Sequence, residues 1–566
     1  MQPKGSRSEL AFAKIAFAKV AIAMTLTTAS VAAAQAAVIE GHVRGASGPV
    51  AGALITVTSP DGLYAETVYS NDKGAFRLET DQVGLVTVRA RKAYFADGSQ
   101  AIDLGAKSSG PLDLLLAPLT SPQAISDSLS ASAHFARIRF DDPKEKEWFQ
   151  VECLTCHQVG NAYTRMPKAR DRWTQVLTRM LGFYNVTDQK WIDHYVDVLS
   201  KAFDGTPYDT KQQHPFDPMI DTARFIEWKL PQGFIAHDVE YLPKDGKFYT
   251  VDQGNDQIYI TDPKTRVTDV FRIPNDGIPV GGKFLAMFGN PNPFSLAVSR
   301  GPHSLQLGPD GHYYTTDTVS GQIGEFDPAT RTYVGHDIGG KALYPHTLRF
   351  DRKQRVWFTL GVSNQVGFLD ISNDRMQLID VPTDTDRAQM PALMPYGIDV
   401  NPLDGSIWWS SLMANRIGRI DGETLEVKLF TPPTVGPRRM RFAPDGTLWI
   451  PSFGNGELVK LDTKTMQYER YPIPPLAAGE VEAPYALGVH PQTGDVWITS
   501  NMSDRMFRFL PREKRFVSYP LPTRGIYLRD IVFMPQGWVC AASSPVPAAL
   551  TVEGGIQEIG CLDPGS

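Results

Sequence analysis

The sequence has few cysteines, little net charge and, beyond its N-terminus, no long apolar run. Four cysteines among 566 residues exclude a disulfide-dense scaffold. A formal net charge of −6, with no run of Lys or Arg after the first twenty residues, argues against nucleic acid as a partner. No later segment reaches the roughly 20 apolar residues that a membrane-spanning helix needs. We therefore expect a mature protein that does not span a membrane.

The N-terminus has the pattern of a secretory signal peptide. Four basic residues precede the mostly apolar segment Val20–Ala33, and Ala34-Gln35-Ala36 offers a small-x-small cleavage site. An uncleaved membrane anchor is the alternative, but Thr and Ser residues dilute a segment that is already short for a span. We expect residues 1–36 to be removed and the mature protein to be periplasmic. There, Cys540 and Cys561 either form a disulfide or stay as buried free thiols.

Length and turn residues predict several β-rich units. The chain is several times the usual domain size, so we expect three or four folded units. Its 48 glycines and 43 prolines recur at intervals and do not gather in one stretch, which favours many short strands joined by turns. The predicted fold class is mainly β.

Residues 38–118 alternate apolar and polar side chains over short runs, which predicts half-buried strands. The runs Gly48–Ala53 and Asp72–Phe76 resemble the carboxypeptidase regulatory-like domain. That resemblance implies a small prealbumin-type β-sandwich with a structural or adhesive role.

Residues 119–222 change to helical spacing, and we expect a small α-helical domain there. The expected helices are Pro143–Val151, Trp173–Leu181 and Asp188–Phe203. In the last of these, Trp191, Tyr195, Val198 and Leu199 would share one face.

The run Cys153-Leu154-Thr155-Cys156-His157 lies in this helical part and predicts one covalently attached haem c. Two cysteine sulfurs would add to the haem vinyl groups, and the adjacent imidazole would ligate the iron. A redox or zinc-binding cysteine pair is the alternative, but no second pair lies nearby to complete a zinc site.

The sixth iron ligand is predicted from a resemblance. Trp173 and the Arg179-Met180 pair, followed by Trp191–Phe203, resemble the small cytochrome c domains of periplasmic dehydrogenases. That resemblance implies iron ligation by His157 and Met180, with Met166 and His194 as alternatives. A Met ligand indicates electron transfer, whereas an open site indicates small-molecule chemistry.

Residues 223–566 repeat one phrase with a period of about 45 residues, which predicts propeller blades. In each copy a Pro, or a diverged residue in its place, is followed by one residue that we expect to point toward the central axis. Those residues are His237, His303, His346, Tyr396, Arg438, Tyr485 and Arg529. They either form a cup that binds a small molecule carrying an anionic group or simply hydrogen-bond neighbouring blades.

The phrase Pro302-His303 followed by Gly308-Pro309-Asp310-Gly311 is similar to the virginiamycin B lyase family. That resemblance implies a seven-bladed β-propeller in which a His acts as general base beside a carboxylate fourteen positions later, assisted by Mg²⁺. Here the corresponding pair is His303 and Asp317, while His237 has Asp252 fifteen positions on and His346 has Leu360. The candidate catalytic residues are therefore His303, Asp317, His237 and His346.

Three functions fit this plan. An oxidoreductase would bind substrate in the propeller mouth and pass electrons through the haem to a periplasmic acceptor, which explains why a haem domain is fused to the propeller. A lyase of the virginiamycin type would use His303 or His237 as base. A non-enzymatic protein would use its haem domain only to transfer electrons between partners. We expect the first.

Overall fold

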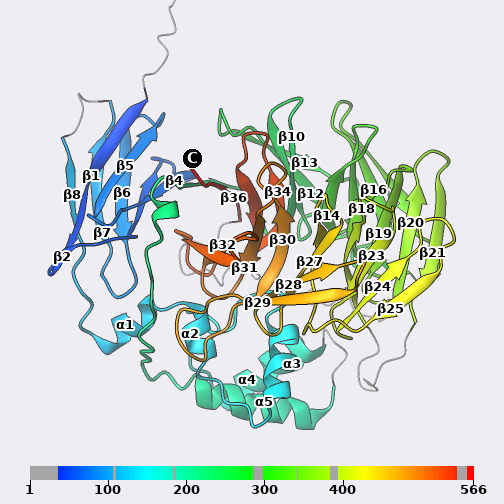
Figure 1. Ribbon diagram of the computed structural model, residues 1–566, viewed down its shortest axis with the longest axis horizontal. Coiled ribbons are helices and arrows are strands. Elements are labelled where there is room, and N and C mark those ends of the chain that lie inside the picture. The colour runs from blue at the N-terminus through cyan, green and yellow to red at the C-terminus, as the bar shows by residue number, and fades with distance from the viewer. Residues whose placement is uncertain are drawn as a thin grey trace, which may run out of the picture.

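The computed structural model describes residues 36–105, 110–182, 187–283, 285, 297–340, 342–382, 393–544 and 557–565. The predicted signal peptide thus lies, apart from its last residue, outside the described residues. The described chain forms a β-sandwich, a small helical part and a large propeller (Figure 1). The expectation of a mainly β protein is confirmed.

The sandwich contains two four-stranded groups, as the alternation of residues predicts. One sheet holds β1 (Ala37–Gly45), β2 (Gly48–Pro49), β5 (Ala75–Thr80) and β8 (Leu112–Leu115). The other group holds β3 (Leu54–Thr58), β4 (Tyr64–Tyr69), β6 (Leu85–Arg91) and β7 (Gly98–Asp103). Alternate residues of β1 and β6 face inward, so Ile39, Val43 and Val88 fill the core between them.

Five α-helices follow the sandwich. They are α1 (Pro122–Ser128), α2 (Ala131–Phe135), α3 (Pro143–Cys153), α4 (Arg170–Gly182) and α5 (Gln189–Ala202), and a short 3-10 helix η1 (Pro218–Ile220) comes after them. Asp142 and Asp188 cap α3 and α5 by accepting backbone N–H bonds. The buried face of α5 includes Ile192, Tyr195, Val196 and Leu199. Tyr195 and Leu199 were predicted for this face, whereas Ile192 and Val196 take the places expected for Trp191 and Val198. Trp191 lies at its edge, 41% exposed.

Seven four-stranded blades form the propeller, which confirms the predicted architecture. The first three blades are β10 (Ala236–Leu242), β11 (Lys247–Asp252), β12 (Gln257–Thr261) and β13 (Thr268–Arg272); β14 (Pro302–Leu307), β15 (Tyr313–Asp317), β16 (Gln322–Asp327) and β17 (Thr332–Asp337); and β18 (Pro345–Phe350), β19 (Arg355–Leu360), β20 (Gln365–Asp370) and β21 (Arg375–Asp380). The next three are β22 (Pro395–Val400), β23 (Ile407–Ser411), β24 (Arg416–Ile420) and β25 (Val427–Phe430); β26 (Arg441–Phe442), β27 (Thr447–Ser452), β28 (Glu457–Asp462) and β29 (Gln467–Pro472); and β30 (Pro484–Val489), β31 (Val496–Ser500), β32 (Arg505–Leu510) and β33 (Arg515–Pro520).

The seventh blade closes the ring and also joins the sandwich. It combines β34 (Leu528–Phe533), β35 (Val539–Ser543) and β36 (Glu558–Asp563) with β9 (Arg224–Lys229), the first propeller strand in the sequence. The other edge of β9 pairs with β4, from Tyr64↔Trp228 to Val68↔Arg224. One eight-stranded sheet therefore runs from blade seven into the sandwich, which lies beside that blade (Figure 1).

A disulfide joins Cys540 and Cys561, which face each other on β35 and β36. Of the two states expected for these cysteines, the structure thus contains the bonded one, buried in the core of blade seven. No helix within the described ranges combines the length and the apolar character needed to cross a bilayer.

Candidate active site at the propeller mouth

The innermost strands of blades one to four bring four rings together on the propeller axis. Each ring belongs to the first or second residue of an inner strand. The centroid of His303 lies 3.6 Å from that of His237 and 4.2 Å from that of His346, and His346 lies 3.9 Å from Tyr396. All four side chains are buried. The three histidines singled out by the repeat therefore pack against one another.

Arg438, Tyr485 and Arg529 complete the circle. The Tyr485 hydroxyl accepts from Tyr396 Oη at 3.1 Å and from Arg529 Nη1 at 3.3 Å. It also lies 3.4 Å from His237 Nε2, which links the last blades back to the first. We call these seven residues the mouth ring.

Burial lowers the pKa of all three histidines well below the usual value, and nearby arginines lower it further. They are therefore neutral at pH 7. His303 Nδ1 donates to the backbone carbonyl of His346 at 3.2 Å, which leaves Nε2 of His303 as the nitrogen with a lone pair. A neutral imidazole of this kind can accept a proton.

A layer of charged residues lies directly behind the mouth ring. Arg439 Nη1 is 2.8 Å from Asp238 Oδ1 and 2.9 Å from Asp530 Oδ2. Asp530 also pairs with Arg349 and Arg441. The carboxylates behind the ring are thus held by arginines and fix the inner strands in place.

Arg438 differs from Arg439 because no carboxylate compensates its charge. Its side chain is fully buried, with the guanidinium carbon 4.1 Å from the centroid of Tyr485 and 4.2 Å from that of Phe453. Nη2 donates to the Tyr396 hydroxyl and Tyr527 lies within hydrogen-bonding reach, while Nε and Nη1 have no hydrogen-bond partner among the described residues. Within the described ranges Arg529 likewise forms no ion pair, and it donates to Ser544. A buried unpaired charge costs several kcal/mol, so this part of the ring is suited to an anion.

Tyr485 lies among these arginines. Burial alone would raise the pKa of its phenol, but the positive charges of Arg529, Arg439 and Arg438 together lower it below the usual value. Tyr485 is therefore the tyrosine of the ring best placed to release or exchange a proton.

Among the described residues no hydrogen bond or ion pair joins Asp317 to His303. Asp317 lies opposite Pro302 in the β14–β15 pair and accepts from Tyr333 Oη at 2.7 Å and Thr315 Oγ1 at 2.9 Å. Arg300 Nη1 is 3.4 Å from its other oxygen. The Asp252 carboxylate similarly accepts hydrogen bonds from the backbone N–H groups of Phe234 and Ile235. Both carboxylates therefore stabilise the local structure around their own strands. Their spacing of fourteen or fifteen residues from His303 and His237 in the sequence does not lead to a described hydrogen bond with these histidines.

The Cys153–His157 turn lies on the mouth, a position that the sequence did not reveal. The Tyr527 hydroxyl bonds the carbonyls of Leu154 at 2.5 Å and Thr155 at 2.8 Å. On the preceding helix α3, Val151 packs against Tyr396 and Leu412. The helical part accordingly covers one end of the propeller (Figure 1). The helical part therefore lies over the mouth ring.

The turn itself has the chemistry that a haem c requires. Cys153 and Cys156 are not bonded to each other, and α3 ends at Cys153. His157 Nδ1 donates to the carbonyl of Gln158 at 2.8 Å, so Nε2 is the nitrogen left for a metal. Burial raises the pKa of the Cys156 thiol, whereas the charges of Arg529 and Arg438 lower it, which places both arginines close to Cys156. The residues present therefore fit the group.

The three candidates for a sixth ligand lie in different surroundings. Met180 is half-buried in the last turn of α4, next to Arg179, whose charge lowers the pKa of His157 after the larger effect of burial. Met166 is 46% exposed. His194 Nε2 is bound by the Glu145 carboxylate. Met180 stays the prediction, and His194 is the least available.

A group of three side chains able to hold a metal ion occurs elsewhere. Asp310, His312 and Glu325 converge in blade two, outside the mouth ring. Behind the ring, Asp238 and Asp530 are held by arginines. The expected Mg²⁺ stays a prediction.

Two family comparisons agree with this fold. Residues 38–117 match the carboxypeptidase regulatory-like domain, so the N-terminal part is similar to modules of that type. Residues 292–560 match the virginiamycin B lyase family, and the propeller is therefore virginiamycin B lyase-like. Neither match includes Cys153–His157.

Solved structures of low identity resemble the propeller. A streptogramin B lyase is 18% identical, with 60% of this chain and 97% of that chain covered and a TM-score of 0.48. Virginiamycin B lyase from Staphylococcus aureus is 16% identical, with 60% and 99% covered and a TM-score of 0.47. Hydrazine synthase from Kuenenia stuttgartiensis is 13% identical, with 56% and 94% covered and a TM-score of 0.42. No curated protein matches the chain.

Proposed function

We propose that the protein is a periplasmic oxidoreductase that binds a small anionic substrate at the mouth ring and passes its electrons through one haem c to a periplasmic acceptor. The observation that carries this proposal is the place of the Cys153–His157 turn. It is held against the propeller by Tyr527 and lies close to Arg438 and Arg529. A redox-neutral reaction has no use for a haem at that position.

Cys153 and Cys156 would hold the haem through thioethers, and His157 Nε2 would ligate its iron, with Met180 as the predicted sixth ligand. When bound, this group supplies one-electron redox chemistry. Gln158 keeps the His157 ring in place through its carbonyl, and its side-chain amide donates to Asp504 Oδ1 at 2.8 Å. That contact ties the iron ligand directly to the propeller.

The mouth ring supplies binding and proton transfer. Arg438 and Arg529 would hold the anionic group, because both are buried and neither is neutralised by a described carboxylate. Tyr485, whose hydroxyl contacts Arg529 and His237, would relay a proton released when the substrate is oxidised, passing its own proton to the lone pair of His237 Nε2 as it takes up the new one. The neutral Nε2 of His303 is a second acceptor on the same axis.

The test is a spectroscopic screen of the purified full chain. Visible spectra of the oxidised and reduced protein, with the intact mass, first establish covalent haem. Small carboxylates are then added anaerobically, and we expect one class to reduce the haem. Arg438→Met should abolish this reduction while the attached haem is retained, whereas Arg375→Met, on an exposed strand end, should behave as the unmodified protein.

A lyase is the second candidate, favoured by the match of residues 292–560. It predicts product formation with no change in the haem spectrum, and loss of activity on chelation of Mg²⁺. The described hydrogen bonds of Asp317 and His303 go to other partners, Tyr333 and the carbonyl of His346, which weighs against the base and carboxylate pair that this reaction would use. Reversible haem reduction without turnover of any substrate would contradict both enzymatic functions.

A further inference from the structure

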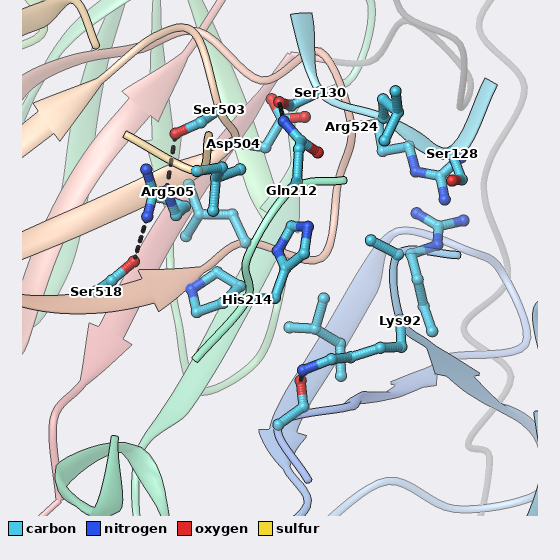
Figure 2. A pocket seen from close by; sticks show the side chains of 18 of the residues that line it. Lys92, Ser128, Ser130, Gln212, His214, Ser503, Asp504, Arg505, Ser518 and Arg524 are labelled. Atoms are coloured by element: carbon cyan, nitrogen blue, oxygen red, sulfur yellow. Dashed lines mark hydrogen bonds between the residues drawn. The ribbon is translucent and has the colours of Figure 1, made fainter. Parts of the chain in front are cut away.

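A cavity of about 90 Å³ lies where the sandwich, the helices and the propeller meet (Figure 2). The sandwich contributes Lys92, the helical part Ser128 and Ser130, the following segment His214, and the propeller Arg505 and Arg524. Figure 2 shows Arg505 and Arg524 on opposite sides of the cavity, with Lys92 and His214 between the sandwich and the propeller. This cavity is separate from the mouth ring.

Lys92 is a desolvated ammonium without a carboxylate partner. Its Nζ donates to the carbonyls of Ala51 at 2.8 Å and Gly52 at 3.3 Å, which occupies two of its three N–H groups. Burial lowers the pKa of Lys92 to about 8, and no charged neighbour offsets that effect. At pH 7 the group is still protonated, so the cavity contains a positive charge that an anion would neutralise.

His214 adds a neutral donor to the same wall. Its Nε2 is buried and has no hydrogen-bond partner. Burial, followed by the charges of Lys92 and Arg505, lowers the pKa of His214 to about 3, so the imidazole stays neutral. An imidazole Nε2–H can donate to an anionic oxygen, which would satisfy a polar atom that is otherwise left unpaired.

The other charged groups at the cavity already have partners. Arg505 pairs with Glu482 at 2.5 Å, and Arg91 pairs with Asp97 at 2.7 Å. Asp504 accepts from Gln158, and Arg524 reaches the carbonyl of Asp127. Carboxylates thus neutralise Arg505 and Arg91, whereas the described contacts of Lys92 and Arg524 are with backbone carbonyls, which leave positive charge at the cavity.

We propose that this cavity binds a small inorganic oxyanion of the phosphate or sulfate type, held by the Lys92 ammonium and the Nε2–H of His214. The volume admits such an ion, since a water molecule takes about 30 Å³. Several oxygens on one centre suit donors that arrive from two directions. Because these donors belong to different parts of the chain, the bound ion links the sandwich to the segment that leads into the propeller.

The test measures binding of inorganic phosphate and of sulfate to the full chain at constant ionic strength, with chloride as the balancing salt. Calorimetric titration and thermal unfolding should both show saturable binding to the unmodified protein. Lys92→Met should weaken it at least about tenfold, because a charge-assisted hydrogen bond is lost. Lys73→Met, a matched change at an exposed lysine of the same sandwich, should bind as the unmodified protein does.

Two results would overturn the proposal. One is the absence of saturable phosphate or sulfate binding to the folded protein. The other is phosphate or sulfate binding that is unchanged in Lys92→Met. If Arg438→Met then abolishes that binding, the ion belongs to the mouth ring. His214→Phe serves as a second variant that removes a donor without altering charge, and we expect it to weaken binding less than Lys92→Met.

Discussion

Replacing Lys92 with Met should change how the stability of the protein depends on pH. The pKa of Lys92 is about 8 in the folded chain, against an unperturbed value of 10.5. Each pKa unit corresponds to about 1.4 kcal/mol, so holding the protonated side chain in the cavity costs the folded state about 3 kcal/mol at pH 7. Between pH 8 and 10.5 the unfolded chain binds a proton that the folded chain does not. The cost is therefore relieved, and stability rises over that window.

The assay is urea unfolding at pH 7 and pH 10 in a buffer free of phosphate and sulfate. The transition to follow is the one in which the sandwich detaches from the helical part and the propeller. The unmodified protein should gain about 2.5 kcal/mol more than Lys92→Met between these two pH values, because part of the cost remains at pH 10. Lys73→Met should follow the unmodified protein, so that alkaline effects on other groups cancel. Adding phosphate should shrink the difference, because a bound anion raises the pKa of Lys92. Equal pH dependence in Lys92→Met and the unmodified protein would refute the reasoning.

Further expectations concern the mouth and the propeller. Tyr527→Phe removes the donor to the carbonyls of Leu154 and Thr155 and should weaken docking of the helical part by about 1–3 kcal/mol; faster hydrogen exchange around Cys153 would report it, and unchanged exchange would contradict it. Replacing Cys540 and Cys561 by Ser opens a short covalent loop and should cost about 3 kcal/mol of stability, measured by denaturation with and without reductant. Asp317→Asn disturbs a buried pair with Arg300; it should lower the melting temperature yet leave turnover intact, and a selective loss of turnover would restore Asp317 as a catalytic residue. Met180→Ala should disturb the low-spin visible spectrum of the haem protein while Met166→Ala should not, and the opposite pattern would exchange their roles.

Local patterns predicted the elements well because their causes are local. Alternation of buried and exposed residues gave strands such as β1 and β6, and the recurrence of one phrase gave seven blades. In six blades the predicted ring residue is the second residue of the inner strand. In blade five the strand starts only at Arg441, and an isolated bridge between Pro437 and Ser452 precedes it. The face of α5 was misjudged by one position because Trp191, although large and apolar, stacks on Tyr195 at the helix edge.

Relations between distant segments could not be predicted from the sequence. Docking of the helical part depends on Val151, which contacts Gly436 and Gly454; a Cβ on either glycine would come within 2.6 or 2.7 Å of its methyl group. Strand pairing places Asp317 opposite Pro302, and its carboxylate accepts from Tyr333 and Thr315, which the spacing to His303 does not reveal. The cavity around Lys92 and His214 exists only where three parts of the chain meet. Sequence spacing contains none of these relations.

The eight-stranded sheet sets an order on how the chain can fold. Strand β9 precedes the other propeller strands in sequence, yet one of its neighbours, β36, is the last strand of all. Long-range pairing of this kind is slow, because the long intervening chain must close into a loop before the stabilising contacts between the strands can form. The sandwich can fold early, and its β4 edge offers β9 a template while the remaining blades form. During folding, the sandwich would thus act as a scaffold that binds the first propeller strand until the final strand pairs with it and closes the ring.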